Sequence, residues 1–196
     1  LFHMLDHYST RGQQDKFFEL FFGHFHPENT KMIPECQYQV RMRAAQMYAK
    51  RAIDEKNPAL FDNAFIQLGF CDRLSSIRNE HIMERGRILF HQEKYGEALK
   101  QFELAATYPV PSTQAFAEHS YYTWQAKASI ANCLEKMDRL QDAWIVYHHA
   151  LQAGGPVYEN IVKLEARVRE SDPWPKAEGE AEGLPRLLIV DALQQF

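Results

Sequence analysis

The segments GRILFHQEKYGEALKQFELAA (residues 86–106) and ANCLEKMDRLQDAWIVYHHAL (residues 131–151) repeat one pattern of small and large residues. Their gap-free alignment pairs Gly86 with Ala131, Leu89 with Leu134, Tyr95 with Leu140, Ala98 with Ala143, Phe102 with Tyr147 and Ala105 with Ala150. Small residues allow two helices to cross closely, and large residues fill the space beside the crossing. A short polar turn separates the two halves of each copy. Each segment therefore predicts one antiparallel pair of helices.

The composition of the whole chain agrees with a helical fold. Ala, Leu, Glu, Gln, Met, Lys and Arg account for 97 of the 196 residues, whereas Val, Ile and Thr account for 22. The first group favours helices, and β-branched residues favour strands. Gly and Pro together number 18, too few for the many turns of a sandwich or barrel. We therefore expect an all-α chain.

The repeated pattern resembles the tetratricopeptide repeat, a helix–turn–helix unit of about 34 residues. Residues 79–112 and 124–157 carry small, aromatic and aliphatic residues at the positions that this family prefers. A third, degenerate copy lies upstream, where Ala64 corresponds to Ala98 and Ala52 takes the place of the first glycine of the pattern. The resemblance implies a right-handed superhelical stack of antiparallel helix pairs, an α-solenoid.

Periodicity and helix stop signals predict seven helices in this region, over residues 35–56, 59–74, 77–92, 95–107, 113–137, 139–152 and 157–170. The two clear copies are offset by 45 residues, eleven more than the family's unit. Eleven residues make about three helical turns, so the extra length can extend one helix without rotating its faces. We expect residues 116–122 to form this extension and to protrude beyond the stack.

The chain divides into four expected parts. Residues 1–34 form an aromatic-rich N-terminal helical cap, and residues 35–170 form the repeat domain. Residues 171–186, SDPWPKAEGEAEGLPR, are an acidic linker rich in Pro and Gly, and residues 187–196 are an apolar C-terminal tail. On helical spacing, Phe18, Phe21, Phe22 and Phe25 share one face of the cap. We expect this face to be buried against the rest of the chain rather than against a partner.

Charge, hydropathy and cysteine content argue against nucleic-acid-binding, membrane-spanning and disulfide-rich secreted proteins. The formal net charge of −4 argues against general binding to nucleic acid or to an anionic membrane. No apolar stretch is long enough to span a membrane. The three cysteines, Cys36, Cys71 and Cys133, are far apart and odd in number, which favours a reduced, cytoplasmic setting over a disulfide scaffold.

The resemblance implies that a partner peptide or helix binds the concave face, which the first helix of each pair lines. We expect nine residues to form this groove: Gln46, Ile53, Glu80, Met83, Arg87, Phe90, His91, Gln125 and Asn132. Their mixed character, partly apolar and partly of either charge, suits a protein segment better than a phosphate or a nucleic acid.

A second set of candidates consists of aromatic residues outside the repeat pattern. Tyr121, Tyr122 and Trp124 lie in or next to the extra turns. Either the N-terminal aromatic helix covers them, or they form an interface hot spot. Phe18 and Phe22 are candidates for the same role if their face is open, and the chain would then form a homodimer or join a larger complex.

Two rival hypotheses remain. An enzyme could use His3, His7 or Cys36, although no catalytic or metal-binding motif accompanies them. An RNA-binding repeat protein could use the basic helix over residues 35–56, which includes Arg43 and Lys50. We favour a non-catalytic protein–protein interaction scaffold, without cofactor or metal, that serves as a subunit or adaptor of a larger complex.

Overall fold

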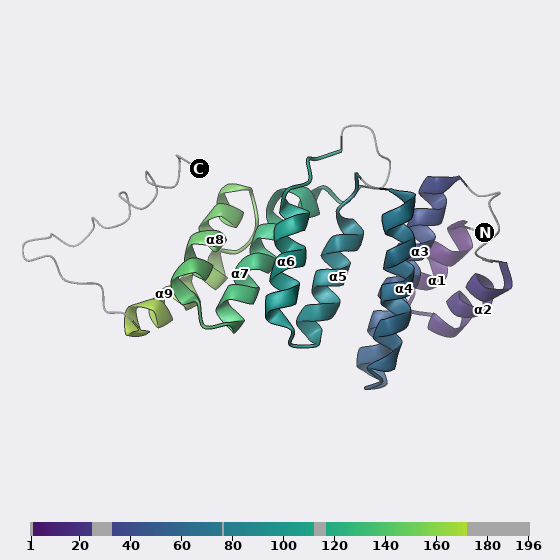
Figure 1. Cartoon of the computed structure of the whole chain (residues 1–196), viewed down its shortest axis with the longest axis horizontal. Helices are drawn as coiled ribbons and strands as arrows, with labels where there is room; N and C mark the ends of the chain where they lie inside the picture. The colour runs from purple at the N-terminus through teal and green to yellow at the C-terminus, as the bar shows by residue number, and fades with distance from the viewer. Residues whose placement is uncertain (1, 25–32, 76, 112–116, 172–196) are drawn as a thin grey trace, which may run out of the picture.

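The structure is a computed structural model that describes residues 2–24, 33–75, 77–111 and 117–171. Every regular element in these ranges is a helix, and the helices follow one another in a row (Figure 1). The elements are α1 (Phe2–Thr10), α2 (Gln14–His24), α3 (Pro34–Asp54), α4 (Ala59–Leu74), α5 (Glu80–His91), α6 (Tyr95–Ala106), the π-helix η1 (Tyr121–Gln125), α7 (Ala126–Lys136), α8 (Leu140–Gln152) and α9 (Tyr158–Ser171).

The all-α prediction is confirmed for the described residues. Helices α3 and α4, α5 and α6, and α7 and α8 pack as successive pairs joined by short turns, and α9 packs against α8. The predicted helix over residues 59–74 has the observed bounds, and most others differ by one to three residues at an end. The handedness and superhelical form of the stack remain predictions.

The three helix pairs share one kind of turn. Lys56, Glu93 and Asp138 each adopt a positive φ of 52° to 60° at the end of the first helix. The next residue's N–H donates to a carbonyl five residues earlier in all three pairs, at 2.9 to 3.0 Å. This Schellman pattern satisfies carbonyls that a helix end leaves free. The shared turn also supports counting α3 and α4 as a third copy of the pair.

The turn between α3 and α4 changes the register of that third copy. The turn itself is one residue longer than its two counterparts. Ala64 follows Lys56 by eight residues, whereas Ala98 follows Glu93 and Ala143 follows Asp138 by five. Counted back from the turn, Ala52 corresponds to Leu89, and Ala49 corresponds to Gly86. The sequence alignment, which placed Ala52 opposite the glycine, was therefore displaced by three residues in the first helix.

Two apolar cores run through the row of helices. The first lies among α1, α2, α3 and α4 and takes Ile88 from α5, and the second lies among α5, α6, α7, α8 and α9. Phe65 packs against both cores. The repeat alanines Ala64, Ala98 and Ala143 are fully buried, as expected for residues at helix crossings.

The N-terminal aromatic helix belongs to the first core. Phe17, Phe18 and Phe21 are buried, and the ring of Phe18 lies 4.4 Å from that of Tyr48 on α3. The predicted burial is confirmed for Phe18 and Phe21. The face is rotated from the prediction, however, since Phe17 is buried and Phe22 is 62% exposed. Phe25 lies outside the described residues.

The extension predicted over residues 116–122 differs from the structure. Residues 117–118 are not helical, the helix begins at residue 119, and it passes through η1 before α7. Instead of protruding, η1 packs against α6 and α8. The expectation failed because residues 117–118 approach without helical structure and residues 121–125 form a wider π-turn, so this part of the chain does not continue as straight α-helical turns. The start of this helix predicted at residue 113 lies outside the described residues.

The linker and the tail predicted over residues 171–186 and 187–196 lie outside the described residues, except for Ser171 at the end of α9. Among the described helices, none combines the length and the apolar character that a membrane span requires.

The close crossing of α5 and α6 generates the first prediction. A Cβ atom on Gly86 would lie 2.6 Å from Cε1 of Phe102, whose ring is buried. We expect Gly86→Ala to lower the free energy of unfolding by about 1–3 kcal/mol, because overpacking outweighs the gain in helix propensity. Urea denaturation measures this change.

Gly69→Ala is the matched control, since Gly69 is also inside a helix and a Cβ there meets nothing within 4 Å. This variant should be neutral or more stable by up to about 1 kcal/mol. Equal stabilisation of both variants would show that α5 and α6 do not cross at Gly86.

Candidate functional site

Two hollows lie on the side of the molecule that α3, α5 and α7 line, which we call the α3–α5–α7 face. The first, of about 130 Å³, is lined by Tyr38, Gln39, Met42, Arg43, Gln46, Arg78, Glu80, Glu118 and Tyr121. The second, of about 210 Å³, is lined by Arg87, Phe90, His91, Phe102, Ser129 and Asn132. We call them the α3 hollow and the α7 hollow. Both open along the first helices of successive pairs.

A ridge formed by Arg87 and Tyr121 links the two hollows. The Arg87 guanidinium donates to Oη of Tyr121 at 2.7 Å and to Oε1 of Gln125 at 2.9 Å. It also stacks over the Tyr121 ring, 4.7 Å from the centroid. A carboxylate oxygen of Glu84 lies 3.5 Å from Nη1. Arg87 lines the α7 hollow and Tyr121 lines the α3 hollow, so this one contact shapes both.

The orientation of Asn132 in the α7 hollow is fixed from below. Tyr147 is fully buried, and its hydroxyl donates to Oδ1 of Asn132 at 2.6 Å. Burial, together with the nearby Glu135 carboxylate, raises the pKa of Tyr147 to about 12. The hydroxyl therefore stays protonated and donates its hydrogen bond to the amide oxygen of Asn132.

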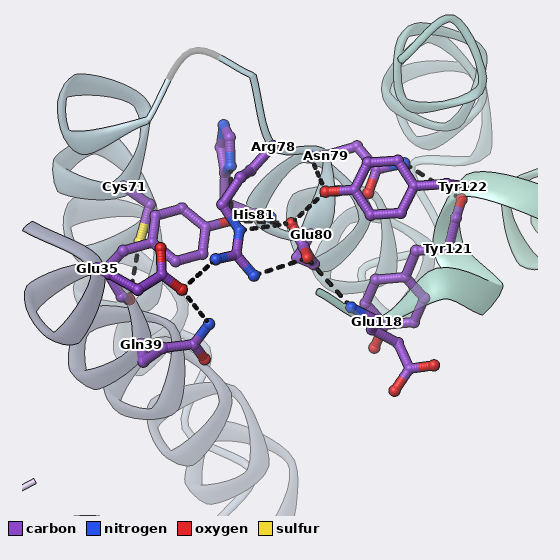
Figure 2. Close-up of polar contacts among 11 residues, drawn as sticks. Glu35, Gln39, Cys71, Arg78, Asn79, Glu80, His81, Glu118, Tyr121 and Tyr122 are labelled. Carbon is purple, nitrogen blue, oxygen red and sulfur yellow. Dashed lines mark hydrogen bonds and ion pairs between the residues drawn. The ribbon is translucent and has the colours of Figure 1, made fainter. Parts of the chain in front are cut away.

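The floor of the α3 hollow is a buried ion pair (Figure 2). Arg78 is fully buried and donates to both carboxylate oxygens of Glu80, from Nε at 3.1 Å and from Nη2 at 2.8 Å. Its Nη1 pairs with Glu35 of α3, and its guanidinium lies 4.4 Å from the centroid of the Tyr38 ring. Arg78 thus ties the start of α5 to α3.

Glu80 receives further hydrogen bonds from the approach to α7. The hydroxyl of Tyr122 donates to Oε2 at 2.7 Å, and the backbone N–H of Glu118 donates to Oε1 at 3.3 Å (Figure 2). Burial alone would raise the pKa of this carboxyl. The hydrogen bonds from Arg78 and Tyr122 outweigh burial and lower the pKa below its usual value. Glu80 is therefore a charged internal anchor.

His81 extends the network to α4. Its Nδ1 lies 3.0 Å from the Tyr38 hydroxyl, and its Nε2 lies 2.8 Å from Oδ1 of Asp72. Arg85 also pairs with Asp72, at 2.6 Å. Burial lowers the pKa of His81, against the opposing effect of Asp72. The imidazole is therefore held in its neutral form near neutral pH.

Asn79 fastens the start of α5 to the second core. It is fully buried, and its Nδ2 donates to the carbonyl oxygens of Ala105 at 3.1 Å and of Tyr121 at 3.2 Å. Its backbone N–H donates to the Tyr122 hydroxyl at 3.2 Å. The residues Arg78, Asn79, Glu80 and His81 therefore connect α3, α4, α6 and η1, and we call this set with its partners the polar joint.

The structure brings part of the predicted groove together. Arg87, Phe90, His91 and Asn132 line the α7 hollow, Gln46 lines the α3 hollow, and Gln125 holds Arg87. Of the other predicted residues, Met83 is fully buried, Glu80 is buried in the polar joint and lines the α3 hollow, and Ile53 is 45% exposed near the end of α3. The side chain of Met83 therefore does not face a partner, whereas that of Glu80 lies at the floor of the α3 hollow.

The hypothesis that the N-terminal aromatic helix covers Tyr121, Tyr122 and Trp124 is wrong. Tyr122 is buried against Glu80 and Asn79, whereas the N-terminal helix packs on α3. Trp124 is half-buried beside Gly155. The cause is the π-turn, which directs Tyr122 into the polar joint. Sequence reasoning also missed Arg78, since charged residues before a helix are typical of a solvated N-terminus.

Residues of the two rival hypotheses are dispersed. His3 and His7 lie on α1 and are exposed, and Cys36 lies half-buried on α3. Searched over the described ranges, the chain shows no group of three or more His, Cys, Asp or Glu that could hold a metal ion. In the basic helix, Arg43 is half-buried and Lys50 is exposed.

Comparison of the chain with protein-family models, with curated proteins and with solved structures finds no match.

The polar joint generates a prediction about stability. Arg78→Met leaves the buried Glu80 carboxylate without its cation, so we expect it to lower the free energy of unfolding by about 3–5 kcal/mol. Arg139→Met is the control, because Arg139 pairs with Asp142 at 2.6 Å with both side chains half exposed. Exposed pairs contribute about 0–1 kcal/mol. Urea denaturation compares the two, and equal losses would contradict the role assigned to Arg78.

His81 generates a prediction about pH. Its pKa in the folded chain lies below the ordinary value of 6.5, so the unfolded chain binds a proton first as the pH falls. The free energy of unfolding therefore falls as the pH drops below about 6.5, where His81 becomes protonated in the unfolded chain first. Glu80, whose pKa in the folded chain is also lowered, causes a further decrease below its ordinary pKa of 4.5.

We expect thermal melts to show a stability that falls between pH 7.5 and pH 5.5, and His81→Gln to flatten this dependence. His91→Gln, at an exposed position, is the control and should leave the dependence unchanged. A profile that is equally steep in the wild type and in His81→Gln would exclude His81 as its source.

Proposed function

We propose that this chain is a non-catalytic protein–protein interaction scaffold that holds a segment of another protein on the α3–α5–α7 face. The observation that carries the proposal is the pair of hollows on this face, joined by the Arg87–Tyr121 ridge. The likeness of the repeated helix pairs to tetratricopeptide repeats supports it, because such pairs present the first helix of each unit to a partner. The chain then acts as a subunit or adaptor of a larger assembly.

The size and spacing of the hollows favour a segment over a small molecule. Each is smaller than the roughly 300–1,000 Å³ that small-molecule sites enclose. The two lie on successive helix pairs, so one extended or helical segment can place side chains in both. The lining is mixed, with the aromatic rings of Phe90 and Phe102 in one hollow and Met42 in the other.

RNA binding through α3 is the second candidate, and the positions of its basic residues favour it less. Arg41 is buried and lies 4.3 Å from the centroid of the Phe70 ring, and Arg51 pairs with Glu55 at 2.6 Å. Nucleic-acid surfaces place several cations along one open stripe.

The three thiols are unpaired, which fits a reducing, cytoplasmic setting as part of the same proposal.

Site-specific photocrosslinking tests the proposed function. A photoreactive amino acid at Asn132 in the α7 hollow should crosslink to a distinct partner in cells, and one at the exposed Gln152 on α8 should not. With the purified partner, we expect Ser129→Trp to weaken binding at least tenfold by filling the hollow. Gln152→Trp is its matched control and should leave the affinity unchanged.

Crosslinking from both positions to the same proteins, or from neither, would contradict a partner site on this face. Crosslinking to RNA from Lys50 alone would favour the second candidate.

A further inference from the structure

We infer that the α7 hollow selects a partner segment carrying a carboxylate side chain beside an apolar side chain. This inference rests on the proposed function and deepens it by naming the chemistry of the occupant. It follows from the hydrogen-bonding groups that line the hollow, from the apolar floor beneath them and from the number of cations available.

The lining of the α7 hollow is rich in donors and holds no carboxylate. Arg87, His91, Ser129 and Asn132 all carry N–H or O–H groups, and the other two lining residues are phenylalanines. The amide oxygen of Asn132 already accepts a hydrogen bond from the buried Tyr147 hydroxyl at 2.6 Å, and its NH2 group adds two further donors. An occupant with acceptor atoms is therefore favoured over one with ammonium or guanidinium groups.

The floor of the same hollow is aromatic. Phe102 is buried, with 2% of its surface exposed, and Phe90 is half-buried and packs edge-on against Tyr95 at 5.1 Å. Donors at the rim and rings at the floor require two kinds of group in one occupant. An aspartate or glutamate next to an aliphatic or aromatic residue in a peptide supplies both.

The α7 hollow offers at most one cation to an occupant. Arg87 is the one permanently charged side chain among the lining residues, and it already lies 3.5 Å from the Glu84 carboxylate. A guanidinium binds a carboxylate through parallel hydrogen bonds, whereas sites for phosphorylated residues gather several arginines. Glu84 repels a phosphate dianion more strongly than a singly charged carboxylate. The charge balance thus favours a carboxylate over a phosphoryl group.

A peptide library tests this inference on the full chain. A displayed library of random twelve-residue peptides is selected on the protein, and each enriched peptide is synthesised with its acidic residue and with the matching amide. We expect the change from acid to amide to raise Kd at least tenfold. We also expect a phosphoserine in place of the acid to bind no more tightly than the acid.

Variants of residues in the α7 hollow test whether the preference for the acidic peptide arises there. Asn132→Asp places a negative charge at the rim and should weaken the acidic peptide at least fivefold while leaving the amide peptide unchanged. Arg87→Gln should bring the acid and amide peptides within about twofold of each other. The charge-matched controls are Gln152→Glu on α8 and Lys100→Gln on α6, both at exposed positions, and they should change neither affinity. Circular dichroism confirms that each variant is folded.

The outcomes separate this inference from the proposed function. If Ser129→Trp abolishes peptide binding but acid and amide peptides bind the wild type equally, the charge selectivity is overturned and the proposed function stands. Tighter binding of the phosphoserine peptide would also overturn it. If no peptide is enriched, or if binding is indifferent to Ser129→Trp, both proposals fall.

Discussion

The buried ion pair between Arg78 and Glu80 is the interaction on which the rest of the molecule depends. The two apolar cores are linked through Phe65 of α4 and Ile88 of α5, and charged side chains connect the start of α5 to α3. Such a pair is stable in the interior only when its remaining donors and acceptors are satisfied. Glu35, Tyr122 and the Glu118 backbone provide this, so four segments are fixed by one carboxylate and one guanidinium (Figure 2).

The shape of the α3–α5–α7 face depends on the polar joint. Because Tyr122 is bound to Glu80, the neighbouring Tyr121 is directed toward Arg87 and forms the ridge between the hollows. Arg87 in turn is presented to the α7 hollow with its guanidinium plane fixed by stacking. The candidate binding surface is therefore preorganised by hydrogen bonds among buried residues, which reduces the entropy lost on binding.

The sequence was sufficient to predict the helices and their pairing, because apolar periodicity and turn residues report local structure directly. It also placed Arg87, Phe90, His91 and Asn132 among the groove residues, since position along the first helix decides which side chains reach that face. It could not reveal that Arg78 is buried, because charged residues are usually exposed and their burial depends on partners remote in the chain. The π-turn was equally hidden, as it depends on the tertiary bond between Tyr122 and Glu80.

The π-helix η1 makes this part of the chain sensitive to length. An α-helix turns by about 100° per residue, so removing one residue from the wide turn would rotate everything on one side of it relative to the other. Tyr122 would then leave Glu80 while α7 kept its place against α8. The turn between α3 and α4, by contrast, already holds one residue more than its two counterparts, and Ala64 is still fully buried. Insertions and deletions should thus be tolerated at the ends of the helix pairs and rejected inside η1.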